Sequence, residues 1–213
     1  MAPSHADPRL ARVAGALYLA IILCGLTAEL VLRGPLLRGT PDEVARMLAG
    51  NLWQLRLSLL ADTVMLLADV ALALVFFTLM RPVSPALALA AMVFRLGQAI
   101  LIGASLMALA SAPALLADAP RIAVHMTALH AIGYDVGLIL FAVNCGLMAV
   151  LFWRSAVPKL IAAGIAASAL VYAAGSLVRL LAPAASALIE PAYLVPMVAE
   201  SALCLWLLIR ARV

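Results

Sequence analysis

Six long apolar runs constrain this chain more than any other feature of its sequence. An α-helix needs about 20 apolar residues to cross about 30 Å of hydrocarbon, because each residue adds about 1.5 Å. Hydrophobic residues make up 67% of the chain and charged residues only 11%, which is more apolar surface than a soluble core can bury. We therefore predict an all-α polytopic membrane helix bundle with six transmembrane helices, forming a single domain over residues 1–213. The predicted spans cover residues 14–32, 57–80, 86–110, 128–153, 160–181 and 192–209.

The connection between the first two spans contains a strong helix start. Thr40 has the properties of an N-cap, Pro41 suits the first helical position, and Glu43 completes a capping box. Val44 and Leu48 then share one helix face. This pattern predicts a short helix in the first outer loop, and two interpretations of it stay open: an interfacial helix lying on the membrane surface, or an ordinary solvated loop helix.

Basic residues are distributed unevenly between the two sides of the predicted spans. Loops rich in arginine and lysine stay on the cytoplasmic side, so both termini are predicted to be cytoplasmic in an inner (plasma) membrane. This role accounts for the formal net charge of +4 without a nucleic-acid partner, and none is expected. Seven basic residues lie on the terminal side, namely Arg9, Arg12, Arg81, Arg154, Lys159, Arg210 and Arg212, against Arg33, Arg38, Arg46 and Arg121 on the other.

The cysteine and histidine residues predict neither a metal site nor a bound cofactor. Cys24, Cys145 and Cys204 lie in different apolar runs and show no CxxC spacing. His125 and His130 fall at the same end of one span, which does not favour a bis-histidine haem site.

Ionisable residues inside the spans are the most informative positions for function. A charge at the bilayer centre costs about 2.5–3.5 kcal/mol, so five charges facing lipid would cost on the order of 15 kcal/mol. These side chains are therefore expected to face the bundle interior, where carboxylates pair with arginines or stay neutral. They are Glu29, Asp62, Asp69, Arg95, Asp135 and Glu200, with Arg56, His130 and Arg179 nearer the outer ends.

Helical geometry predicts how these residues meet. The rise per residue places polar residues from all six spans in one layer in the outer half. Asp62 and Asp69 share a helix face, and Arg95 and Gln98 share another, where they could hold one carboxylate or ligand between them.

The fourth span contains two predicted features. Asp135 points about 140° away from His130 and is expected to face a different neighbour. Gly133 and Gly137 form a GxxxG pair, for which packing within the monomer is favoured over dimerisation.

Several local strings run along nearly the whole chain: Arg12-Val-Ala-Gly-Ala-Leu-Tyr18, Glu29-Leu-Val-Leu-Arg33, Arg56-Leu-Ser-Leu-Leu-Ala-Asp62, Phe94-Arg95-Leu-Gly-Gln98, Gly133-Tyr-Asp135-Val-Gly-Leu138 and Glu200 with Leu205-Trp206-Leu-Leu. Together they resemble a bacterial integral membrane family catalogued as domain of unknown function 4386. The resemblance implies that the intramembrane ionisable residues follow a family pattern, but it implies no reaction.

Three functions are compatible with this polar set. The first is a membrane-embedded acid/base enzyme on a lipophilic substrate such as an isoprenoid, with Asp62, Asp135 and Glu200 as candidate catalytic carboxyls. The second is a proton-coupled small-molecule transporter or binding protein, and the third is a non-catalytic membrane component whose ion pairs are structural. Expected partners are membrane lipid and a lipophilic small molecule, with a homodimer as an open alternative. The candidate substrate-binding residues are Glu29, Arg56, Asp69, Arg95, Gln98, His130 and Tyr172.

Overall fold

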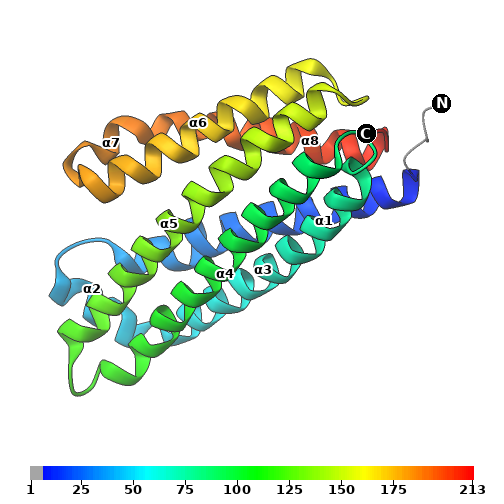
Figure 1. The fold of residues 1–213 in the computed structure, drawn as a ribbon. Helices are drawn as coiled ribbons and strands as arrows, with labels where there is room; N and C mark the ends of the chain where they lie inside the picture. Colours follow the sequence, from blue (N-terminus) through cyan, green and yellow to red (C-terminus); the bar gives the residue numbers. More distant parts are fainter. Residues whose placement is uncertain (1–6) are drawn as a thin grey trace.

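The computed structural model describes residues 7–213, and six of its helical segments are long and apolar enough to cross a membrane. This confirms the predicted all-α, six-span fold (Figure 1). The first segment is α1 (Pro8–Leu26), which continues through a π-helical turn (Thr27–Arg33) and a 3-10 turn (Gly34–Leu37). The others are α3 (Leu52–Met80), α4 (Pro85–Leu115), α5 (Pro120–Trp153), α6 (Lys159–Leu181) and α8 (Leu194–Ile209), the last preceded by Pro183–Ala185, α7 (Ser186–Ile189) and Glu190–Tyr193.

The six spans pack as a ring in chain order. Helix α1 packs on α3, α3 on α4, α4 on α5, α5 on α6 and α6 on α8, and α8 closes the ring against α1. Because six is an even number, the start of α1 and the end of α8 lie at one end of the bundle, called here the terminal end (Figure 1). The opposite end carries α2 (Pro41–Gly50) and α7 and is called the α2 end.

Helix α2 forms as its sequence predicts and covers the α2 end. The Thr40 side chain accepts a hydrogen bond from the Glu43 N–H (3.4 Å), and the Glu43 carboxylate accepts one from the Thr40 N–H (2.7 Å). This backbone N–H, followed by the Thr40 hydroxyl, lowers the pKa of Glu43 from its ordinary value. The buried face of the helix, Val44 and Leu48, belongs to a small core with Leu36, Leu55, Leu106 and Leu109.

Five of the six spanning helices begin earlier than the apolar runs indicate, and α8 begins two residues later. Helix α5 begins at Pro120 rather than at residue 128, because Arg121 and His125 extend it with an exposed polar turn beyond the apolar stretch. Proline opens α1, α2, α4 and α5, at a position whose N–H has no partner within a helix. Apolar runs therefore locate the spans, and prolines locate the starts of these four helices.

The GxxxG pair lies inside the monomer, against α4. A Cβ added at Gly133 would lie 2.6 Å from Ser105 Cβ, and one added at Gly137 would lie 2.9 Å from Ile102 Cγ1. The two glycines thus allow α4 and α5 to approach closely, as the favoured interpretation of the sequence predicts.

Replacing Gly133 with alanine should lower the melting temperature of the protein. The added methyl group has no room beside Ser105, and overpacking of this kind costs about 1–3 kcal/mol. The matched control is Gly146→Ala on the same helix, where no atom lies within 4 Å of the added Cβ. This control should leave stability unchanged or raise it, since alanine favours helix by about 1 kcal/mol over glycine. Equal melting temperatures for the two variants in detergent would contradict the α4–α5 packing.

Candidate functional site

A salt bridge between Asp69 and Arg95 lies at the middle of the ring. Arg95 Nη2 donates to Asp69 Oδ1 (2.5 Å), and Gln98 Nε2 donates to Asp69 Oδ2 (3.2 Å). Arg95 Nη1 is 3.5 Å from the side-chain oxygen of Asn144, whose amide donates to the Ala91 carbonyl (2.8 Å). Arg95 and Gln98 therefore hold one carboxylate between them, as their spacing predicts.

Aromatic rings enclose the Arg95 guanidinium on two further sides. Its Cζ lies 5.7 Å from the centroid of the Tyr18 ring and 5.2 Å from that of Phe141. At these separations a ring face attracts a cation, and the attraction is strongest where water is excluded. Arg95 itself is only 2% exposed. The surroundings of Arg95 can therefore stabilise positive charge away from water.

Glu200 on α8 lies beside this group but has a different environment. The Tyr172 hydroxyl donates to Glu200 Oε1 (2.7 Å), and the Tyr18 hydroxyl also lies close to this carboxyl group. Among residues 7–213, no basic side chain forms a salt bridge with Glu200, although it is only 8% exposed. The central cluster, to which all six spans contribute, comprises Tyr18, Asp69, Arg95, Gln98, Phe141, Asn144, Tyr172 and Glu200.

A second ionic group lies nearer the α2 end, where Arg33 bridges two carboxylates. Arg33 donates to Asp62 on α3 and, at 2.6 Å, to Glu29 one turn earlier. Arg33 and Asp62 are buried, whereas the Glu29 side chain is 60% exposed. Arg33 was predicted to lie in the loop after the first span. This prediction was wrong, because Arg33 lies within the first long apolar helical segment. The spacing of four between Glu29 and Arg33 is the one signal in the sequence that points to this pair.

The π-helical turn explains why Arg33 faces inward. The Gly34 N–H bonds to the Glu29 carbonyl, so one extra residue enters the turn. A Cβ at position 34 would lie 2.5 Å from that carbonyl oxygen, so the turn requires glycine there. Such turns are frequent at functional sites and redirect the side chains that follow.

A third ionic group joins α5 to α6. Arg179 donates through Nε to Asp135 Oδ1 (2.8 Å) and through Nη2 to the same oxygen, and its Cζ lies 5.1 Å from the Tyr193 ring. Asp135 therefore faces α6, whereas His130 on the same helix faces α4, as the helix geometry predicts. The polar residues divide by their hydrogen bonds into three groups rather than the single layer that depth alone indicated.

His130 and Arg56 take no part in these three groups. His130 Nδ1 lies 3.0 Å from Ser105 Oγ, and the Ser105 hydroxyl donates to the Ile102 carbonyl (2.7 Å). The Ser105 hydroxyl proton is thus used in the bond to Ile102. Nδ1 of His130 therefore carries a proton of its own and donates it to Ser105 Oγ. His130 Nε2 is buried and has no hydrogen-bond partner among residues 7–213. Arg56 is exposed, and its side chain makes no hydrogen bond within the same residues.

The central cluster is tightly packed. A cavity of about 10 Å³ touches Arg95 and Asn144, which is room for about one water molecule. Arg95 Nε and Gln98 Oε1 are buried polar atoms without a partner in the part of the chain that the structure describes. Over that same part, histidine, cysteine and acidic side chains nowhere gather in the threes that a metal ion would need.

A ring of six apolar helices around buried charge defines a polytopic α-helical membrane protein. Residues 13–211 match the family described as Domain of unknown function (DUF4386), so the chain belongs to this family, as the resemblance of its local strings implies. No curated protein and no solved structure matches the chain.

The Asp69–Arg95 pair makes a direct prediction for stability. Arg95→Leu should destabilise the protein by about 3–5 kcal/mol, because it leaves Asp69 charged and unpaired in the bundle. Adding Asp69→Asn should restore much of the lost melting temperature, since the orphaned charge is then removed. The control is Arg95→Leu with Asp62→Asn, which neutralises a carboxylate that binds Arg33 instead. Equal rescue by both second substitutions in thermal melts would contradict the pairing.

Proposed function

We propose that this protein is a membrane-embedded acid/base enzyme that acts on a lipophilic substrate, for example an isoprenoid, with Glu200 as its proton donor. The observation that carries the proposal is the position of Glu200, a buried carboxyl that hydrogen-bonds to Tyr172 and forms no salt bridge among residues 7–213. An unpaired charge is costly inside a membrane, so the protonated carboxyl suits this environment and has a proton to give.

The surroundings of Glu200 suit a reaction that passes through a cation. Glu200 gives its proton to a carbon–carbon double bond, and the ring of Tyr172, whose hydroxyl bonds to Glu200, stabilises the resulting carbocation. The carboxylate then takes a proton from a neighbouring carbon, so the double bond moves and Glu200 is regenerated. Tyr172 holds the carboxyl group in position throughout.

The other candidate carboxyls have less support for a catalytic role. Asp62 and Asp135 are each bound by an arginine, so both carboxyl groups already have a charged partner. Substrate must reach Glu200 by movement of a helix, because the cavity at Arg95 is small. Helix α8 is the best candidate for this movement, since an irregular segment from Pro183 to Tyr193 joins it to α6.

A transporter has less support than an enzyme. Apolar side chains fill the ring between the central cluster and the terminal end, where Phe76 stacks edge-on with Tyr18 (6.2 Å between centroids) and with Phe152 (5.7 Å). The polar groups therefore lie toward the α2 end, and no polar path from Glu200 to the terminal end is present in the described part of the chain.

A structural role for the charges is the second candidate, and a specific observation favours it. The three buried aspartates each form a salt bridge with an arginine of a neighbouring helical segment. Such pairs fix how helices dock. If this role extends to Glu200, the protein is a non-catalytic membrane component, and the next experiment separates the two.

Replacing Glu200 with glutamine should abolish function while the protein still folds. The glutamine amide keeps the volume of the side chain and can still bond to Tyr172, but it cannot act as an acid. Loss of general acid catalysis lowers a reaction rate by about 100-fold or more. The measurement is the lipid profile of cells that lack the gene and carry either wild type or a variant, beside the abundance of folded protein. Glu200→Gln should give the profile of cells without the gene, at wild-type abundance.

The matched control makes the same change at Glu190, an exposed residue before α8, and should restore the wild-type profile. Full complementation by folded Glu200→Gln would end the enzyme proposal. A loss of folded protein in proportion to the loss of function would favour the structural candidate.

We further propose an inner-membrane location with both termini in the cytoplasm. Exposed basic residues number seven at the terminal end and four at the α2 end, where Arg33 is buried and Arg56 is exposed, so the asymmetry remains. Reporters fused after Arg81, Arg154 and Val213 should read cytoplasmic, and reporters near Asp42 and Asp118 or at residue 185 should read periplasmic. A periplasmic reading at Val213 would contradict this orientation.

A further inference from the structure

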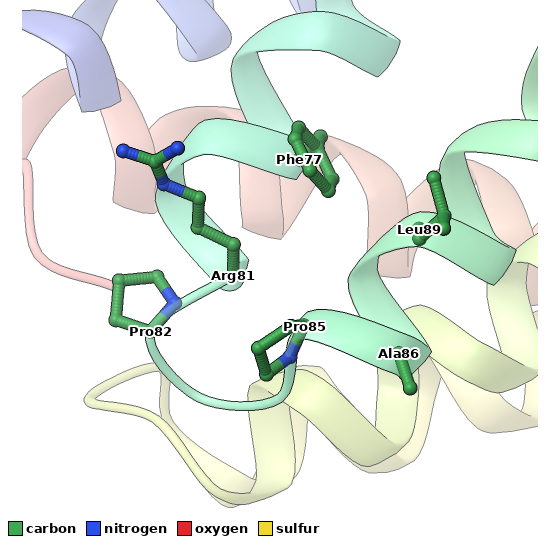
Figure 2. Close-up of a pocket in the computed structure, with 6 residues that line it drawn as sticks. All are labelled: Phe77, Arg81, Pro82, Pro85, Ala86 and Leu89. Carbon is green, nitrogen blue, oxygen red and sulfur yellow. The ribbon is translucent and has the colours of Figure 1, made fainter.

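A pocket opens on the outside of the ring where α3 ends and α4 begins. Its volume is about 510 Å³, and it lies at the terminal end (Figure 2). It is separate from the central cluster, and neither the sequence patterns nor the proposed reaction accounts for it. Six residues line it: Phe77, Arg81, Pro82, Pro85, Ala86 and Leu89.

The backbone holds this pocket in a fixed shape. Pro82 and Pro85 restrict the turn, and the N–H groups of Val83 and Ser84 both bond to the Met80 carbonyl (2.9 and 3.2 Å). Little conformational freedom is therefore lost when a ligand binds, which favours binding.

The lining is apolar, and one cationic side chain lies at its edge. Phe77, Ala86 and Leu89 supply an apolar wall on the lipid-facing side of the helices, and Leu89 is 49% exposed. Arg81 is exposed and forms no salt bridge among residues 7–213. In Figure 2 its guanidinium lies at one edge of the group, on the side away from Leu89 and Ala86. One cation thus borders an apolar surface at the end of two spans.

We propose that this pocket binds an anionic phospholipid. Its phosphate lies on Arg81, which can bond to two phosphate oxygens at once, and an acyl chain packs on Phe77 and Leu89. An exposed arginine alone holds free phosphate weakly, because surface charge pairs are worth little. The apolar wall adds the contact that a lipid supplies and inorganic phosphate does not. The net positive charge of the terminal end also attracts anionic headgroups.

The test measures lipid retained by the full-length protein. Wild type and variants are purified in detergent, mixed with equal amounts of dioleoyl phosphatidylglycerol and dioleoyl phosphatidylcholine, and analysed by native mass spectrometry. Wild type should retain phosphatidylglycerol in preference. Arg81→Gln should reduce retained phosphatidylglycerol about fivefold, the equivalent of about 1 kcal/mol per basic residue. Ala86→Trp should reduce the bound lipid, because the indole covers the apolar wall on which the acyl chain packs.

Arg154→Gln is the matched control, because Arg154 is exposed at the same end but does not line the pocket. It should retain lipid as wild type does. Leu89→Trp repeats this experiment if Ala86→Trp does not fold. Unchanged retention in Arg81→Gln, equal loss in Arg154→Gln, or equal binding of phosphatidylcholine by wild type would each overturn the proposal, as would full retention in a folded tryptophan variant.

Discussion

The cost of charge in hydrocarbon is the constraint on which the arrangement of this bundle depends. Three arginine–aspartate pairs reduce this cost, because each charge has an opposite charge beside it. Each pair joins helical segments that are neighbours in the ring. Arg33 ties the first span to α3, Arg95 ties α4 to α3, and Arg179 ties α6 to α5. A buried charge that loses its partner costs several kcal/mol, so each pair fixes the rotation of two helices about their axes. Helix α8 is the exception, because its one buried charge-bearing residue, Glu200, bonds to a phenol rather than to an arginine. Its packing depends on small residues instead: Gly15 and Gly164 each approach it closely.

This exception gives the central cluster its chemical asymmetry. Asp69 accepts from two donors, the Arg95 guanidinium and the Gln98 amide. Glu200 accepts from the Tyr172 hydroxyl, and the Tyr18 hydroxyl also lies close to its carboxyl group. Two acids of one cluster therefore have different surroundings, an ion pair at Asp69 and a phenol at Glu200, and such a difference can give two carboxyl groups different roles. The rings of Tyr18 and Phe141 flank Arg95 rather than an open space, so the cation that they contact is the guanidinium itself.

The sequence predicts the parts of this structure that depend on one helix and misses those that depend on the rotation of several. Apolar runs locate the spans because length and hydropathy are local properties. Arg95 and Gln98 share a carboxylate because residues three apart share a face. Arg33 is missed because its inward direction comes from a π turn, which no apolar period reveals. Depth along the span also brings Asp62, Asp135 and Glu200 together in one layer. It does not determine the direction that each helix faces, and hydrogen bonds divide these residues into three groups.

Phe77 connects the central cluster with the pocket on the outside of the ring. It lines the pocket beside Arg81 and also the small cavity that touches Arg95 and Asn144. One phenyl ring is therefore a shared wall between a lipid-facing surface and the buried polar residues. Rotation of a side chain needs far less rearrangement than separation of two packed helices, and it occurs on a much shorter timescale. In the proposed lipid complex an acyl chain packs against Phe77 and restricts that rotation, so the proposal implies that the outer pocket and the small cavity at Arg95 affect each other through this residue.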